Sequence, residues 1–235
     1  MAILTSGLFV TGTDTGVGKT YVSAGIATAL KLRGVNVGVM KPAETGCRIR
    51  AGRLMPKDAL VLMKSACVKD QLSLVNPYRL RKPLAPSVAA AREGKKIDPD
   101  KILKAFNTLR EKHEFMIVEG AGGIMVPLCG QYTYLDLACT MGLPVLIVAR
   151  PGLGTINHTL LSIAALKGRN LTIAGIVINY ALDWKPGMAE ETSPAVIEEI
   201  SGIRIAGIIP HASRKFDSVL DGCIKYNTMS EQRCL

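Results

Sequence analysis

The chain has 235 residues, of which 48% are hydrophobic and 20% are charged, so it can bury a substantial core. This composition excludes a mainly disordered chain and a small disulfide-stapled protein. The net charge of +10 is concentrated in residues 31–115, which carry 19 Lys and Arg against 8 Asp and Glu. Such a segment attracts polyanions, such as nucleic acid, membrane phosphates or ATP. Because no nucleic-acid-binding motif accompanies it and aromatic residues make up only 5%, we expect no nucleic-acid partner.

The sequence also indicates where in the cell the protein is expected. The longest apolar run, 143–149, is far shorter than the roughly 20 residues that a membrane-spanning helix needs. Residues 1–12 lack a basic start and run into a glycine-rich motif, so we expect a first strand there rather than a signal peptide. The six cysteines form no CxxC pair, and the three histidines give no zinc-binding spacing. We expect a cytoplasmic protein with reduced cysteines and no membrane partner.

Short β-branched runs alternate with helical patterns along the chain. The patterns predict strands at 8–11, 36–40, 115–119, 144–149, 171–179 and 203–209, with a loop over 42–56. They predict helices at 19–33, near 87–93, and at 98–112, 134–141, 155–167 and 194–200, and Asp58 caps or opens another. This alternation indicates an α/β fold. We expect a single domain over 1–235, in three layers, with a doubly wound, mostly parallel sheet and helices on both faces.

Polar and special residues fall where these strands end. Lys19, Lys41, Glu119, Asn179 and Pro210 all lie at or just past the predicted carboxyl ends of strands. In open α/β sheets ligands bind outside this edge. The simplest interpretation is one site for a nucleotide and a substrate.

The segment GTDTGVGKT, residues 12–20, follows a strand and opens a helix. It approximates the phosphate-binding pattern GxxxxGK[ST], although Thr13 occupies the first glycine position and Gly12 comes one residue early. Its backbone N–H groups can cradle phosphates, Lys19 would reach the β- and γ-phosphates, and the Thr20 hydroxyl would ligate Mg²⁺. The alternative, an ordinary glycine-rich turn, does not account for the GKT sequence in this context.

Magnesium needs further oxygen ligands, usually one or two carboxylates. Glu119 ends an apolar strand and precedes Gly-Ala-Gly-Gly, so it is the first candidate; the alternative is a salt-bridged residue at a strand end. Asp58 is the second candidate, although on its own it is more typical of a helix N-cap. The expected cofactor is therefore Mg²⁺, with ATP as co-substrate.

Six motifs occur in order along the chain: GTDTGVGKT (12–20), MKPAETG (40–46), KDAL (57–60), VEGAGG (118–123), LGTINH (153–158) and GIVIN (175–179). Together they resemble the dethiobiotin synthetase family as far as about residue 212, less closely in 60–110, and the tail 213–235 is poorly matched. The resemblance implies an ATP- and Mg²⁺-dependent ligase of biotin biosynthesis. It would convert 7,8-diaminononanoate and CO₂ to dethiobiotin, with ADP and phosphate as the other products.

The resemblance also implies a chemical route and residue roles. One amine becomes a carbamate, the carbamate takes the γ-phosphoryl group as a carbamic-phosphoric anhydride, and the second amine closes the ring. Lys41 would be the active-site lysine, with Lys19 and Thr15 also catalytic; the alternative for Lys41 is a snorkelling lysine at a strand end. Thr15, Thr45 and Asn157 would contact the substrate, and Thr20, Asp58 and Glu119 would ligate Mg²⁺.

The nucleotide site implied by the resemblance is larger. It comprises Gly16, Val17, Gly18, Lys19, Thr20, Tyr21, Asp58, Glu119, Gly120, Ala121, Gly122, Asn179, Pro210, His211 and Ala212. An acid often follows the proline loop in this family; Asp217 is the nearest acid here, and the sequence does not place it. Family members are homodimers that hold the substrate carboxylate near the interface, where 152–157 falls. Asn157 is then a contact from the partner subunit, or else simply part of a helix N-terminus.

Three other functional classes are alternatives to this assignment. Partitioning- and septum-type ATPases carry a signature lysine in KGGxGKT, where this chain has Asp14. Glutamine-dependent amide-forming enzymes need a further domain with a reactive cysteine, for which this chain is too short. A nucleic-acid-binding module built on 31–115 would lose affinity steeply with salt.

Overall fold

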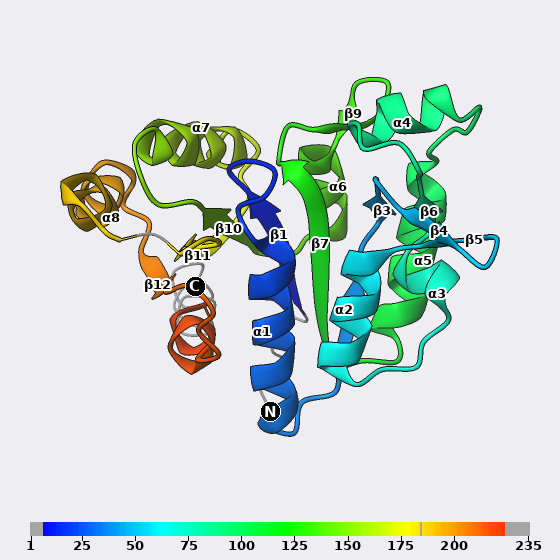
Figure 1. The fold of residues 1–235 in the computed structure, drawn as a ribbon, viewed down its shortest axis with the longest axis horizontal. Helices are drawn as coiled ribbons and strands as arrows, with labels where there is room; N and C mark the ends of the chain where they lie inside the picture. Colours follow the sequence, from blue (N-terminus) through cyan, green and yellow to red (C-terminus); the bar gives the residue numbers. More distant parts are fainter. Residues whose placement is uncertain (1–6, 184, 224–235) are drawn as a thin grey trace.

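The central element of the computed structural model is a six-stranded sheet, within the described residues 7–183 and 185–223. Its strand order is β12-β11-β10-β1-β7-β2, and each neighbouring pair is parallel (Figure 1). The strands are β1 (Gly7–Gly12), β2 (Val37–Met40), β7 (Phe115–Gly123), β10 (Val145–Ala149), β11 (Ile173–Asn179) and β12 (Ile205–Ile209). The six expected strands and the α/β fold class are confirmed.

The strand order explains where the helices lie. The labelled helices are α1 (Lys19–Leu32), α2 (Lys57–Ala66), α3 (Leu72–Val75), α4 (Pro86–Arg92), α5 (Pro99–Arg110), α6 (Tyr134–Met141), α7 (Thr155–Lys167) and α8 (Met188–Ser201). Residues 217–223 are helical as well. The chain runs from β1 outward to β2, and β7, β10, β11 and β12 then follow in the opposite direction. Because such crossovers are right-handed, α1 falls on one face of the sheet and α6, α7 and α8 on the other. Figure 1 shows α1 crossing in front of the sheet.

The direction of winding reverses at β1, which lies between β7 and β10. At such a switch point the loops beyond neighbouring strand ends diverge and leave a crevice. Every residue of β1, β10 and β11 is buried, as expected for parallel strands covered on both faces. The buried strands thus hold the loops above them in fixed positions.

The structure differs from the expectations in the stretch 42–56. This expected loop contains β3 (Ala43–Glu44), which pairs with β6 (Tyr78–Arg79), and a hairpin of β4 (Arg48–Arg50) and β5 (Arg53–Met55). A second unexpected hairpin joins β8 (Pro127–Cys129) to β9 (Tyr132–Thr133). Strands of two or three residues are too short to show a hydrophobic alternation that a sequence pattern could detect.

Two helix starts also differ from the expectations. Helix α8 begins at Met188 rather than Pro194, and the Gly187 N–H donates to Glu190 Oε2 at 2.9 Å. Pro194 therefore lies inside this helix, not in its first turn. Asp58 lies in the first turn of α2, and the N-cap is Pro56, so the capping alternative for Asp58 is wrong. Among the described residues, no helix combines the length and hydropathy needed to cross a membrane.

Candidate functional site

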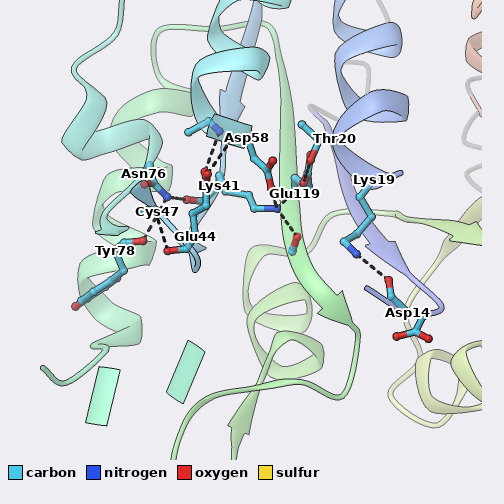
Figure 2. A network of polar contacts seen from close by, with 12 residues as sticks. Asp14, Lys19, Thr20, Lys41, Glu44, Cys47, Asp58, Asn76, Tyr78 and Glu119 are labelled. Carbon is cyan, nitrogen blue, oxygen red and sulfur yellow. Dashed lines mark hydrogen bonds and ion pairs between the residues drawn. The ribbon is translucent and has the colours of Figure 1, made fainter. Parts of the chain in front are cut away.

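The glycine-rich segment forms the turn between β1 and α1. Gly16 and Gly18 adopt φ angles of 79° and 91°, which other residues seldom reach. Lys19 begins α1, is 7% exposed, and donates from Nζ to the Asp14 carbonyl oxygen at 3.0 Å (Figure 2). Asn179 at the end of β11 is buried and donates from Nδ2 to the Val17 carbonyl at 2.9 Å. Residues from two strand ends thus fix the shape of a phosphate-binding loop.

A buried charge cluster lies beside this loop, as Figure 2 shows. Lys41 is 3% exposed, and its Nζ lies 2.5 Å from Glu119 Oε1 and 3.1 Å from Asp58 Oδ2. It also donates to the Gly120 carbonyl at 3.0 Å. The Thr20 hydroxyl donates to Glu119 Oε1 at 2.7 Å. The expected rim residues Lys41 and Glu119 are therefore in direct contact.

The two lysines at the site have opposite pKa shifts. Burial, followed by repulsion from Lys41, lowers the pKa of Lys19 to about 8. Burial also acts to lower the pKa of Lys41, but the carboxylates of Glu119 and Asp58 outweigh it and raise that pKa above its ordinary value. Lys41 therefore stays protonated at neutral pH. A polyphosphate would relieve the repulsion between the two ammonium groups.

A cavity of 580 Å³ opens on this cluster. Glu44 and residues 83–86 line part of its wall. The expected residues that line it are Thr15, Gly16, Gly18, Lys19, Thr20, Lys41, Thr45, Asp58, Glu119, Ala121 and Gly122. The structure thus brings together, around one space, the groups that the sequence assigned to phosphates, Mg²⁺ and the diamine substrate.

The donors at this cavity fit Mg²⁺. Glu119 Oε2 is buried without a hydrogen-bond partner, and the Asp58 side chain is 37% exposed at the wall. Within the described part of the chain there is no group of three or more His, Cys, Asp and Glu side chains that could hold a metal. Mg²⁺ in nucleotide sites needs only one or two carboxylates, because phosphates and water complete its octahedron. Thr20, Glu119 and Asp58 meet that requirement.

Two further nucleotide candidates, Val17 and Asn179, lie on the other side of the phosphate-binding loop from the Lys41 cluster. Val17 and Asn179 line a second cavity of 720 Å³, with Thr15 and Gly16 forming part of the shared wall between the two cavities. Asn179 Oδ1 is buried without a partner, so one polar atom is available to an adenine edge.

The segment after β12 is arranged differently. Pro210, His211 and Ala212 are exposed, and the Tyr21 hydroxyl donates to the Ser213 carbonyl. This bond attaches the segment to α1. Asp217, which the sequence left unplaced, pairs with Arg33 at 3.1 Å.

Asn157 lies apart from both cavities. It is exposed in the first turn of α7, which begins at Thr155 as expected. The Thr155 hydroxyl donates to the Arg150 carbonyl at 2.6 Å, and Gly154 precedes the helix with a φ angle of 87°. Within one chain, Asn157 does not join the other substrate candidates.

Sequence reasoning missed three buried polar residues around Lys41. Glu44 is 5% exposed; burial, then the charge of Asp58, raises its pKa, although two backbone N–H bonds oppose the shift. Asn76 donates to the Lys41 carbonyl at 2.6 Å, and Tyr134 is fully buried, which raises the pKa of its hydroxyl. Of these three residues, only Glu44 could have been found from the sequence, because it lies inside the motif MKPAETG.

Comparison with known proteins finds relatives that cover most of the chain and share one name. An AAA domain family model matches residues 6–214. ATP-dependent dethiobiotin synthetase of Thermodesulfovibrio yellowstonii is 43% identical over 213 residues, covering 88% of this chain and 89% of its own. The enzymes of the same name from Methanocaldococcus jannaschii and Bacillus subtilis strain 168 are 42% and 44% identical, covering 86% and 87% of this chain and 92% and 87% of their own.

Solved structures share the fold at much lower identity. The MinC:MinD cell division complex of Aquifex aeolicus aligns with a TM-score of 0.56 at 19% identity, covering 97% of this chain and 96% of that one. A ParA family ATPase from Chlorobium tepidum also has a TM-score of 0.56, at 14% identity, covering 98% and 94%. At this identity the likeness concerns the P-loop fold alone.

Proposed function

The chain belongs to the ATP-dependent dethiobiotin synthetase family, and from this premise we propose that it makes dethiobiotin from 7,8-diaminononanoate, CO₂ and ATP. The observation that carries the proposal is the contact of Lys41 with Glu119 and Asp58 beside a phosphate-binding loop. A carbamate is a weak nucleophile that must approach a polyanion. Its activation requires neutralised charge and in-line positioning, which this cavity can supply.

The residues at the cavity have separate roles in this proposal. Lys41, held protonated by its two carboxylates, would bind the carbamate oxygens and the transferring phosphoryl group. Lys19 and the N–H groups of Gly16 to Thr20 would hold the β- and γ-phosphates. Thr15 and Thr45, which line the same cavity, would orient the diamine and its carbamate. A preorganised donor such as Lys41 contributes about 10²- to 10³-fold in turnover.

The metal would be held by Thr20, Asp58 and Glu119. When bound, Mg²⁺ supplies neutralisation of the phosphate charge. Asn179 would accept from the adenine edge through Oδ1, and Tyr21 with 210–212 would flank the base. The second amine loses its proton to a carbamate or phosphate oxygen, so no buried side-chain base is required.

We also propose that the enzyme acts as a homodimer in the cytoplasm, where ATP is available. Leu153 is 86% exposed and Leu161 is 62% exposed on either side of Asn157, which supports a subunit contact there. In the dimer Asn157 would reach the substrate of the partner subunit. Light scattering coupled to gel filtration would test this: a monomeric mass at assay concentration would contradict it.

Radiolabel incorporation tests the reaction. The protein is incubated with ATP, Mg²⁺, ¹⁴C-bicarbonate and 7,8-diaminononanoate, and the acid-stable label is counted. A free carbamate loses its label in acid, whereas a cyclic urea keeps it. We expect stable label that requires both ATP and the diamine. Absence of stable label, with intact ATP binding, would overturn the substrate assignment and favour a partner-recruiting ATPase.

A further inference from the structure

Glu44 caps a helix that begins thirteen residues after it, at Lys57. Its Oε1 accepts the Asp58 N–H at 2.9 Å, and its Oε2 accepts the Ala59 N–H at 3.0 Å. These N–H groups belong to the first turn of α2, where the local N-cap is Pro56 and makes no side-chain cap bond. A carboxylate at this position satisfies free N–H groups and interacts favourably with the helix dipole.

The capped turn carries a residue of the charge cluster. The Asp58 backbone is bonded to Glu44, and the Asp58 carboxylate lies 3.1 Å from Lys41 Nζ. Glu44 follows Lys41 by three residues and lies on β3 (Figure 2). Glu44 and Asp58, the two partners of the capping bond, both line the cavity. The backbone from Lys41 to Glu44, the cap and the Asp58 side chain thus form a closed ring of contacts.

Asp58 depends on this ring more than its neighbours do. Its side chain is 37% exposed, whereas those of Lys41 and Glu119 are 3% and 0% exposed. Packing therefore fixes Lys41 and Glu119 from many directions, while the orientation of Asp58 is set mainly by the start of its helix. Glu44 is 5% exposed and forms no ion pair within the described residues, so its carboxylate is committed to this backbone.

We propose that Glu44 is a positioning residue: it fixes the first turn of α2 so that Asp58 meets Lys41 and the magnesium–nucleotide side of the cavity. The inference rests on the proposed function for the identity of the reaction. Outer groups that orient metal ligands typically contribute 10- to 100-fold in metal affinity or activity.

A double-mutant cycle tests this role. We expect Glu44→Ala to lower kcat for dethiobiotin about 10- to 100-fold and to raise the Mg²⁺ concentration needed for tight ATP binding, measured by calorimetry. In an Asp58→Ala background the same substitution should change both values less than about threefold, because its effect passes through Asp58. Glu44→Gln, which keeps one acceptor oxygen, should lose less than Glu44→Ala.

Glu93 offers a matched control. It is another carboxylate that accepts two successive N–H bonds, from Arg81 at 2.7 Å and Lys82 at 3.0 Å, and it is not part of the cavity lining. Glu93→Ala and Glu44→Ala should both lower the melting temperature, but Glu93→Ala should leave kcat and the Mg²⁺ midpoint unchanged. If the two variants lose melting temperature and kcat in the same proportion, Glu44 is merely structural and the proposal is wrong.

Two further outcomes would also overturn it. If the effect of Glu44→Ala persists fully in the Asp58→Ala background, Glu44 does not act through Asp58. If instead it disappears in a Thr45→Ala background, Glu44 positions its neighbour Thr45. The calorimetric Mg²⁺ midpoint does not need turnover. If the wild-type protein makes no dethiobiotin, the proposed function fails, and the midpoints of the variants still decide the role of Glu44.

Discussion

Lys41 and Glu119 follow directly on Met40 and Val118, which are register partners in the parallel strands β2 and β7. Strand β2 therefore ends level with Val118, next to Glu119, while β7 continues to Gly123, and this register brings an ammonium group and a carboxylate to 2.5 Å. Glu119 is completely buried, so its charge is stable only with Lys41 and Thr20 beside it. One pair thus links the stability of the sheet edge to the chemistry of the cavity.

Replacing Lys41 should affect both properties. We expect Lys41→Met to lower the rate of urea formation about 10²- to 10³-fold, because a preorganised donor is lost. It should also destabilise the fold by about 3–5 kcal/mol, because Glu119 is left buried without its cation. Urea formation and denaturant unfolding measure the two effects.

The double variant Lys41→Met/Glu119→Gln separates them. Removing both charges should restore most of the lost stability, because no buried charge remains unpaired. Turnover should stay low, since the donor is still missing and the proposed metal ligand Glu119 is lost as well. Recovered turnover in the double variant would show that Lys41 serves only the fold.

Replacing Glu119 on its own should weaken the response to magnesium. Glu119→Gln removes a charged oxygen ligand, so the Mg²⁺ concentration at half-maximal ATP binding should rise by at least about tenfold. Glu114→Gln is a suitable control, because Glu114 accepts the Asn36 N–H at 2.8 Å near the opposite end of the same strand. An unchanged magnesium titration for Glu119→Gln would remove this residue from the ligand set.

The sequence predicted the sheet and most of the cavity for a physical reason. Buried parallel strands have long apolar runs, and residues such as Lys41 and Asn179 interrupt these runs where the strands end. The motif resemblance then supplied Thr15, Thr45 and Asp58. None of these signals depends on a contact between distant parts of the chain.

What the sequence missed does depend on distant contacts. Glu44 caps α2 across fourteen residues, and Asn76 holds the Lys41 carbonyl from a segment with no motif. Tyr134 is completely buried, but it begins a helix with several other buried residues, and nothing in that pattern singles it out. Similarly, β4 and β5 are strands of three residues that only their pairing reveals. Three-dimensional pairing decides these positions, and local patterns do not encode it.

Alkaline pH should weaken ATP binding through Lys19. Its pKa is lowered to about 8, so its ammonium group is lost as the pH rises through that value. Bound phosphate favours the charged form and moves the loss in the complex to higher pH. We expect the dissociation constant for ATP, measured calorimetrically, to rise by up to about tenfold per pH unit above pH 8 until the complex also deprotonates.

Unfolding would not account for this change. Because the pKa of Lys19 lies below its unfolded value of 10.5, the unfolded state binds more protons between pH 8 and 10.5, and this group makes the fold more stable as pH rises. Lys19→Met should bind ATP weakly at every pH, without this slope. A wild-type affinity that stays constant from pH 7 to 9.5 would contradict the assignment.

The shape of the phosphate loop should depend on the missing side chain of Gly18. A Cβ atom there would lie 2.1 Å from Nδ2 of Asn179, which is buried and bonded to the Val17 carbonyl. Gly18→Ala therefore combines the cost of a φ angle of 91°, about 1–2 kcal/mol, with an overpacking cost of about 1–3 kcal/mol. Gly34→Ala, just beyond the other end of α1, has a φ angle of 82° but nothing within 4 Å of its Cβ, so it carries the first cost alone.

Denaturant unfolding of both variants should show the larger loss of stability for Gly18→Ala, and only that variant should lose ATP affinity. Equal losses of stability with unchanged ATP binding would mean that Asn179 moves aside freely and does not hold the loop.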